Sequence, residues 1–458
     1  MHTVMIVGAG QAGLQLALGL QARGYGVTVM TDRTADEVRR GRVTSTQLLH
    51  PTALALERAE GLDLWGAEVP PVEMVDCAVA GPAAGAGGPP TVISRWTGRL
   101  GGVARSLDQR VKLSAWLELF ESRGGSVLRH AATAEDLDWA AARYDLTVCS
   151  TGSRTLAPLF PRDPARSVHT RPQRAFAAAY VHGLGESGPP RVRSTALPGL
   201  GELMVIPAYT HSGPCHILLA EAVPGGPLDV FRDPAARPGE VLAVLCELMR
   251  RHVPADHVEG LGRAVLTDPG AVLVGHRTPV VRRPVAVLPS GRPVLGLGDA
   301  VATNDPLAFQ GGNCAAKAAA HYLEAIVGRA DDQPFDETFL RGVFESWWAR
   351  TGRAATAWSN AVLDLAAAPH LVRLLTAAAV RPGLADLFCR TADDPALAER
   401  LLLDPAAAER LLAELRPDPF AGARISAPSV APLPPRPSLP SPSPPPQPGR
   451  EPAVAVRG

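Results

Sequence analysis

The sequence lacks several features that would place it in other classes of protein. Among its 458 residues, Lys+Arg and Asp+Glu both number 45, so no basic excess exists to neutralise phosphates and we expect no nucleic-acid partner. No uninterrupted apolar run reaches about 18 residues, which argues against a membrane span. The N-terminal residues show no basic segment followed by a cleavable apolar one, so we expect a cytoplasmic protein.

The six cysteines are scattered and form no CxxC pair. They are therefore expected to be reduced, buried or half-buried thiols, without a disulfide framework and without a metal site. We find no internal repeat. What remains is a chain that is 46% hydrophobic, enough for two or three domains with a substantial core.

A strand–turn–helix–strand pattern opens the chain. Val4–Val7 is an apolar strand, Gly8-Ala9-Gly10-Gln11-Ala12-Gly13 is a glycine-rich turn, and a helix and a second strand, Val27–Met30, follow. In this context the GxGxxG spacing predicts a dinucleotide-binding unit.

Each glycine of the turn has its own physical reason. Gly8 permits the tight turn, Gly10 lets backbone N–H groups approach a pyrophosphate, and Gly13 lets helix and strand pack closely. The backbone of Gln11 and Ala12 opens the helix, whose N-terminus faces the anion. Thr31 stands at the usual position of the ribose ligand, with Asp32 one residue later.

A second motif lies about 290 residues further on. Gly298-Asp299-Ala300, Pro306 and Gly311-Gly312-Asn313 follow an apolar strand, Val294–Gly298, and open a helix, Gly311–Val327. Asp299 can accept hydrogen bonds from ribityl hydroxyls, and the glycines at the helix N-terminus can meet the flavin pyrimidine edge. A helix-capping aspartate is the alternative for Asp299 taken alone.

The fold class predicted is α/β, with a discontinuous Rossmann-type FAD-binding domain, an inserted antiparallel substrate domain and a C-terminal helical extension. The FAD-binding domain is assigned to residues 1–70, 107–170 and 285–333, and the substrate domain to 71–106 and 171–284, where short alternating runs suggest antiparallel strands. Helices are expected over 334–424, and the Pro-rich tail, 425–458, is expected to be disordered.

The two motifs together resemble the GD-x6-P…GxN pattern of the para-hydroxybenzoate-hydroxylase-like flavoproteins. Three further segments resemble the oxygenase subunits of styrene/indole monooxygenases: Arg42-Val43-Thr44-Ser45-Thr46, Ser106-Leu107-Asp108-Gln109-Arg110 and Asp305-Pro306-Leu307-Ala308-Phe309-Gln310-Gly311-Gly312-Asn313. The resemblance implies an FAD-dependent monooxygenase that receives reduced FAD from a separate NAD(P)H:flavin reductase. With O2 as co-substrate, one oxygen atom passes from a flavin C4a-(hydro)peroxide to an apolar alkene, indole or thioether.

The resemblance also assigns residues. Arg42 and Arg110 would flank the flavin and its phosphates, and Gln310 and Asn313 would belong to the flavin site. Ser45 stands where the family tends to have an asparagine near the isoalloxazine. Thr151 and Gly152 fit a third strand end that touches the dinucleotide.

No catalytic residue is assigned, because the flavin carries the chemistry. Substrate-side candidates are Ser45, Thr46, His50, Tyr209 and His211, although loop histidines are more often solvated. A small apolar or aromatic substrate is expected, and a homodimer stays open.

Further absences separate the alternatives. The Asp-Gly motif that single-component hydroxylases carry near position 150 is missing, since the chain there reads Cys149-Ser150-Thr151-Gly152-Ser153-Arg154. A second GxGxxG and a Trp-x-Trp-x-x-Pro run are missing too, which disfavours a nicotinamide domain and a halogenase. Two alternatives stay open: a single-component NAD(P)H-dependent aromatic hydroxylase, and a catalytically idle FAD-binding scaffold.

Overall fold

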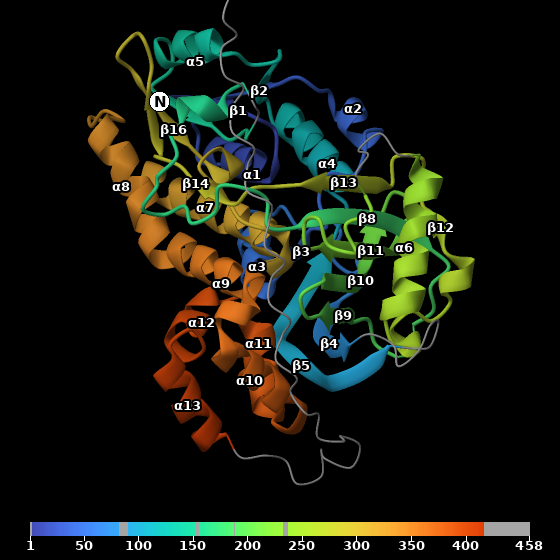
Figure 1. Cartoon of the computed structure of the whole chain (residues 1–458). Coiled ribbons are helices and arrows are strands. Elements are labelled where there is room, and N and C mark those ends of the chain that lie inside the picture. Colours follow the sequence, from blue (N-terminus) through green and yellow to red (C-terminus); the bar gives the residue numbers. More distant parts are fainter. Residues whose placement is uncertain (1, 82–89, 153–154, 187, 232–236, 416–458) are drawn as a thin grey trace, which may run out of the picture. The chain divides into compact units, whose positions relative to one another are not determined.

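The computed structural model describes residues 2–81, 90–152, 155–186, 188–231 and 237–415. The prediction for the Pro-rich tail falls outside these residues. So does most of the Gly81–Pro90 segment, whose glycine-, proline- and alanine-rich composition predicts a loop. Two sheets organise the described chain, and the helices of the C-terminal part pack beside them (Figure 1).

The first sheet has six strands in the order β15-β16-β7-β1-β2-β6. All neighbouring pairs are parallel except β15 with β16. This is the Rossmann-type arrangement that the βαβ pattern predicts. Its strands are β1 (Thr3–Val7), β2 (Gly26–Thr31), β6 (Ser126–Arg129), β7 (Leu146–Cys149), β15 (Val285–Val287) and β16 (Pro293–Gly296).

Helices α1 and α7 pack closely against each other beside this sheet. A Cβ on Gly19 of α1 would lie 2.5 Å from Cδ2 of Leu323 on α7, so the Leu323 side chain would have to shift to accept a larger residue. The helices connected to the sheet are α1 (Gln11–Gln21), α2 (Ala35–Arg39), α3 (Pro51–Ala59), α4 (Gln109–Ser122), α5 (Ala134–Ala141) and α7 (Gln310–Val327). The spacing of apolar residues over Ser106–Arg123 predicts a helix, and the structure begins it three residues later, at Gln109. Ser106 instead ends a strand, and the Asp108 carboxylate caps the helix by accepting from the Arg110 N–H.

The second sheet runs in the order β12-β8-β11-β10-β9-β4-β5-β3, and β13 also pairs with β8. Its pairs are antiparallel except β4 with β9. The strands are β3 (Leu48–Leu49), β4 (Val72–Gly81), β5 (Thr91–Ser106), β8 (Ala175–His182), β9 (Val192–Leu197), β10 (Gly201–Thr210), β11 (Gly213–Ala222), β12 (Val265–Leu266) and β13 (Val272–His276). A separate antiparallel pair joins β14 (Val280–Val281) to β17 (Ala302–Thr303).

The two faces of the second sheet pack against different partners. Helix α6 (Pro238–His252) covers one face with an apolar cluster (Figure 1). The other face joins a cluster shared with the C-terminal helices, in which Trp358 is buried. Helix α11 approaches β5 so closely that a Cβ on Gly98 would lie 2.4 Å from the Ala385 carbonyl oxygen. These helices are α8 (Glu337–Trp347), α9 (Arg353–Leu363), α10 (Pro369–Ala377), α11 (Pro382–Thr391), α12 (Pro395–Leu401) and α13 (Pro405–Glu414).

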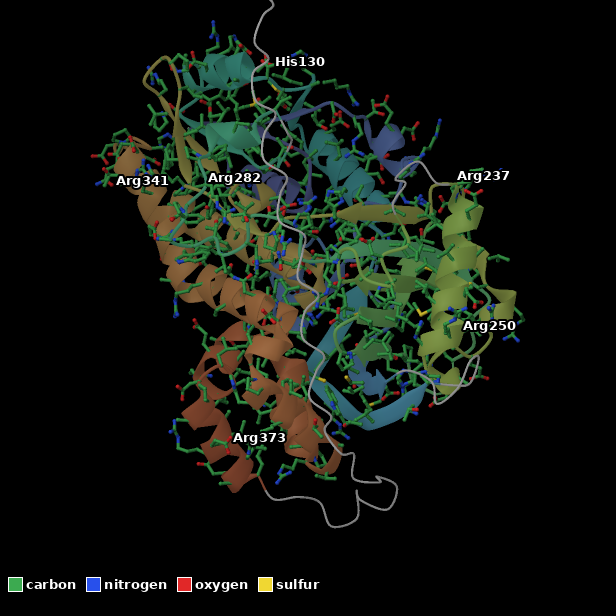
Figure 2. The ribbon with its side chains drawn as sticks, viewed as in Figure 1. His130, Arg237, Arg250, Arg282, Arg341 and Arg373 are labelled. Atoms are coloured by element: carbon green, nitrogen blue, oxygen red, sulfur yellow. The ribbon has the colours of Figure 1, made fainter. Side chains whose placement is uncertain are left out.

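The arginines do not gather into one basic face. Arg237 and Arg250 lie at the two ends of α6, Arg341 lies on α8 and Arg373 on α10, and each pairs with a glutamate (Figure 2). Within the described residues, no helix combines the length and the apolar character needed to cross a membrane. The six cysteines are free thiols, five of them buried.

A cluster of carboxyl groups is buried in and beside the second sheet, at β10 and β11. Glu202 and Glu221 face each other across β10 and β11, and the Arg174 guanidinium pairs with Glu202 alone, at 3.0 Å. Neither oxygen of Glu221 has a hydrogen-bond partner among the described residues, and burial raises the pKa of Glu221 well above its usual range. Burial likewise raises the pKa of Asp305 from 3.8 to about 6. Three acids thus lie within the electrostatic reach of Arg174, which pairs with only one of them.

This cluster makes stability depend on pH. Well below pH 3.8 the Asp305 carboxyl is protonated whether the chain is folded or unfolded, whereas above about pH 6 the folded protein must bury its charge. The contribution of Asp305 to the free energy of unfolding should therefore fall as pH rises from 4 to 6. Asp305→Asn keeps an oxygen for the Leu307 N–H and should raise stability at pH 7 by roughly 1–3 kcal/mol.

Urea unfolding at pH 4 and pH 7 measures this difference. Asp336→Asn is the matched control, because Asp336 also caps a helix but is exposed. An Asp305→Asn gain that is the same at both pH values would contradict the assignment.

Candidate functional site

A cavity of about 610 Å³ lies where the two sheets meet, within the usual size of ligand pockets. It is lined by the β1–α1 turn, the ends of β2 and β7, residues 44–48, the connection from β16 to α7, and three side chains of the second sheet. Both predicted flavin motifs therefore face the same space, although they stand about 290 residues apart in the chain.

The glycine turn fits this space as its spacing predicts. Gly8 has φ 113°, and a Cβ on Gly13 would lie 2.1 Å from the Gly8 carbonyl oxygen. Gly10 is different: its φ is −86°, and no atom lies within 4 Å of the position of its Cβ. Gly8 and Gly13 are thus required by the fold, whereas Gly10 leaves room beside the cavity.

The N-terminus of α1 is left open toward the cavity. Its N-cap, Gly10, supplies no side-chain hydrogen bond, and no acidic residue stands in the first turn. The side chain of Gln11 is fixed from behind, because its Nε2 donates to Glu57, which also pairs with Lys112 at 2.7 Å. The unpaired N–H groups and the helix dipole favour an anion at this point.

The second motif supplies another open helix end. Gly298, Asp299, Pro306, Gly311 and Gly312 all line the cavity. The N-cap of α7 is Phe309, which has φ 54° and offers no side-chain cap. Asp299 follows β16 in a short turn, Gly298–Ala300, rather than at the predicted strand end, and its carboxylate pairs with Arg277.

Two residues of this motif, Gln310 and Asn313, are buried and do not line the cavity. Asn313 donates to the carbonyl oxygens of Leu48, at 2.9 Å, and Phe309, at 2.7 Å, and accepts from the His50 N–H. Gln310 donates to two other carbonyl oxygens. The structure therefore places both as supports of the α7 N-terminus instead of ligands, because their amides are already used by the backbone.

The residues predicted to face the ribose also line the cavity. Thr31 and Asp32 line it together with Arg33 and His130, which sequence reasoning did not single out. Thr151 and Gly152 line the wall after β7, where a Cβ on Gly152 would lie 3.1 Å from the Asp299 carbonyl oxygen. Asp32 is largely exposed.

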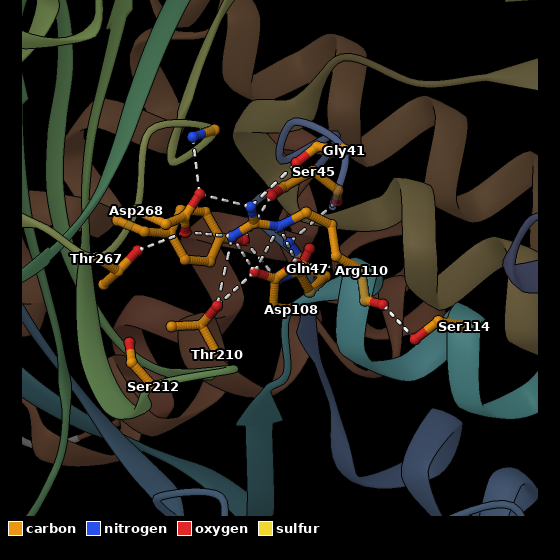
Figure 3. A network of polar contacts seen from close by, with 12 residues as sticks. Gly41, Ser45, Gln47, Asp108, Arg110, Ser114, Thr210, Ser212, Thr267 and Asp268 are labelled. Atoms are coloured by element: carbon orange, nitrogen blue, oxygen red, sulfur yellow. Dashed lines mark hydrogen bonds and ion pairs between the residues drawn. The ribbon is translucent and has the colours of Figure 1, made fainter. Parts of the chain in front are cut away.

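The two arginines assigned from the resemblance lie away from the cavity. Arg42 is exposed, and Arg110 is buried between Asp108, at 2.7 Å, and Asp268, at 2.8 Å (Figure 3). Burial lowers the pKa of Arg110, but the hydrogen bonds that its guanidinium donates to both carboxylates, together with their negative charges, outweigh this effect, and the net shift of the pKa is upward. With its guanidinium taken up by two carboxylates and the Gly41 carbonyl, Arg110 holds the 41–47 loop instead of a phosphate.

The substrate-side candidates divide into two groups. Ser45 and Thr46 line the cavity. His50 is buried behind it, and burial lowers its pKa to about 4. Tyr209 donates to Glu68 at 2.8 Å, and His211 is exposed; neither lines the cavity.

Several lining residues were not found by sequence reasoning. Phe176, Leu219 and Leu273 form an apolar wall from β8, β11 and β13, and Gln47 and Arg277 add polar groups. Only the pairing register of the sheet could have identified this wall. Phe176 on β8 is paired with Glu221 on β11, so their side chains lie on the same face of the sheet. Leu219 lies two residues before Glu221 on β11 and therefore points to that face as well.

The residues present fit FAD. Two open helix N-termini, a glycine with free space beside it and an aspartate after β16 are arranged along one cavity. No group of three or more potential metal ligands occurs within the described ranges.

Comparisons with known proteins agree with this geometry. Residues 152–258 match the family model described as "Styrene monooxygenase A putative substrate binding domain". Styrene monooxygenase StyA of Pseudomonas fluorescens is 30% identical over 396 residues, covering 84% of this chain and 91% of that protein; StyA of a Pseudomonas species is 31% identical with the same coverage.

Solved structures share the fold. The flavin-dependent brominase Bmp2 covers 90% of this chain and 98% of its own, with a TM-score of 0.57 at 15% identity. A mutant of 2-methyl-3-hydroxypyridine-5-carboxylic acid oxygenase covers 86% and 98%, also with a TM-score of 0.57 at 15% identity. The predicted α/β flavoprotein fold is thereby confirmed. With 30% identity extending over most of both chains, this protein belongs to the styrene monooxygenase family of FAD-dependent monooxygenases.

Proposed function

We propose that the chain is the oxygenase component of a two-component system. A separate NAD(P)H:flavin reductase supplies reduced FAD, and one oxygen atom of O2 passes to an apolar alkene, indole or thioether. The observation that carries this proposal is the single cavity in which both flavin motifs face an apolar wall of Phe176, Leu219 and Leu273. A cytoplasmic location agrees with the free thiols.

The chain's residues would hold FAD along the length of the cavity. The Gly8–Gly13 turn and the α1 N-terminus receive the pyrophosphate, Thr31 and Asp32 face the adenosine ribose, and Asp299 faces the ribityl chain. The open N-terminus of α7 favours negative charge on the pyrimidine edge. When bound and reduced, FAD supplies the activated oxygen.

The protein must also place the substrate and exclude water from the flavin. Among the described lining residues, the titratable side chains are Asp32, Arg33, His130, Arg277 and Asp299, and none belongs to the second sheet. No general acid or base therefore faces the substrate from the apolar wall. Binding an apolar substrate against this wall removes water from the flavin face.

The first test separates cofactor binding from folding with two glycines of one turn. Gly10→Ala should leave the free energy of unfolding within about 1 kcal/mol of wild type, because φ is ordinary and space is free. The added methyl group would occupy the space that the pyrophosphate needs. FAD affinity, followed by flavin fluorescence quenching, should fall at least about tenfold, equivalent to 1.4 kcal/mol.

Gly13→Ala is the matched control. Its Cβ would collide with the Gly8 carbonyl oxygen, so the apoprotein should lose roughly 1–3 kcal/mol of stability. Unchanged FAD affinity in Gly10→Ala, or equal affinity of the wild type for FMN and FAD, would contradict the proposed site.

The second test concerns the source of electrons. Hydride transfer requires a nicotinamide held about 3–3.5 Å from the flavin, and the sequence shows neither the Asp-Gly motif nor a second dinucleotide turn. Protein with bound FAD, mixed anaerobically with NADH or NADPH, should therefore bleach almost no flavin. Adding a flavin reductase and O2 should start substrate oxygenation.

The alternatives give different results in the same experiment. Stoichiometric bleaching of the flavin within seconds, without a reductase, would identify a single-component hydroxylase. Steady O2 consumption with chemically reduced FAD, but no product from any alkene, indole or thioether, would identify a catalytically idle scaffold.

A further inference from the structure

Gln47 combines a place on the cavity wall with an unused hydrogen-bond acceptor. It is the last residue before β3, it lines the cavity, and it is 8% exposed. Its Nε2 donates to the Tyr180 hydroxyl at 2.5 Å. Its Oε1 is buried and has no hydrogen-bond partner among the described residues.

The orientation of the Gln47 amide follows from counting protons. The Tyr180 hydroxyl lies 2.8 Å from the Ser45 carbonyl oxygen, which can only accept, so the single phenolic proton is donated there. The hydroxyl oxygen must then accept from Gln47, and only the amide nitrogen can donate. Burial raises the pKa of Tyr180 well above its usual value, so the phenol keeps this proton. Oε1 is therefore the end of the amide that is left free.

The surroundings hold the amide in this orientation. Tyr180 is fully buried in β8, the Gln47 N–H donates to the Ser45 hydroxyl at 3.1 Å, and the neighbouring Leu48 carbonyl accepts from Asn313. Turning the amide over would lose the bond to Tyr180. A buried acceptor without a donor is costly, and beside a binding cavity it indicates that a ligand brings the donor.

The donor could belong to the flavin ring or to the substrate, and the sheet favours the substrate. Tyr180 and Phe176 are four residues apart on β8 and therefore lie on the same face. Phe176 forms the apolar wall together with Leu219 and Leu273. Strand β8, which contributes to this wall, is thus the one that orients Gln47, whereas the two flavin motifs that line the cavity lie at the start of α1 and between β16 and α7.

We propose that Gln47 determines specificity by accepting, at Oε1, a hydrogen bond from an N–H or O–H group of an otherwise apolar substrate, with Tyr180 as its positioning residue. This inference rests on the proposed function, because it assigns the apolar wall to the substrate. The substrate class is an unsaturated or aromatic molecule with one hydrogen-bond donor, in preference to the corresponding pure hydrocarbon.

The test compares indole with indene, two bicyclic molecules of similar shape of which only indole has an N–H donor. Their dissociation constants are measured from the change in flavin absorbance of the oxidised, FAD-loaded enzyme. Wild type should bind indole at least about tenfold more tightly than indene, because a site built for a donor discriminates against the analogue that lacks it. Gln47→Met, which keeps the length but removes the acceptor, should abolish this preference while indene binding stays close to wild type.

Tyr180→Phe provides a second, independent variant. It leaves Gln47 in place but removes the contact that orients it, so the indole preference should fall while FAD affinity is retained. If Gln47→Met does not fold, judged by its melting temperature, the Tyr180→Phe result decides.

Two outcomes would overturn the inference. An unchanged indole-to-indene ratio in the variants would show that Oε1 does not contact the substrate. A loss of FAD affinity in Gln47→Met with an unchanged ratio would place the donor on the flavin ring. Failure of the proposed function is distinguishable, since it would appear as absence of oxygenated product from wild type with a reductase, whatever the binding ratio.

Discussion

The ion pair between the buried Arg110 and the half-buried Asp268 connects the two halves of the cavity. Arg110 lies in the first turn of α4, a helix connected to the first sheet, and Asp268 stands between β12 and β13 of the second sheet. The same guanidinium holds the Gly41 carbonyl, and the adjoining Val43 N–H donates to Gly270. The loop from Gly41 to Gln47 has no strand or helix of its own, so these contacts and Tyr180 define its path (Figure 3). The position of residues 44–48, which line the cavity, therefore depends on these contacts.

The features predicted best from the sequence are those with a local backbone cause. Gly8 needs a positive φ and Gly13 needs close packing, and both requirements exist within a few residues of chain. A strand, a glycine turn and a helix therefore suffice to locate one half of the cavity, and Asp299 with Gly311 locates the other. The roles given to Arg110, Gln310 and Asn313 could not be obtained in this way. Their side chains reach partners far along the chain, and those partners decide whether an amide or a guanidinium contacts a ligand or the backbone.

The apolar wall could not be predicted from the sequence either. Alternation predicts strands in the second half of the chain, but which of two faces meets the cavity depends on pairing between β8, β11 and β13. A shift of one residue would replace Phe176 by Ala177 and Leu219 by Leu218, which belong to the cluster under α6. Strand β5 extends beyond the run that predicts it, Thr91–Trp96, for a related reason: the strand continues through Gly101, at φ 82°, because both neighbouring strands and helix α11 hold it.

The α7 N-terminus illustrates how buried polar groups prepare a binding surface. Phe309 is the one non-glycine residue with positive φ among the described residues, a conformation that costs about 1–2 kcal/mol. Asn313 accepts the N–H of His50 and donates to the Phe309 carbonyl, so the strained residue is held from the side away from the cavity. Consequently the first turn of α7 has no cap, and its N–H groups stay available on the cavity side. Strain at Phe309 and the satisfied amide of Asn313 are therefore two parts of one arrangement, in which the fold keeps a helix end open before any ligand arrives.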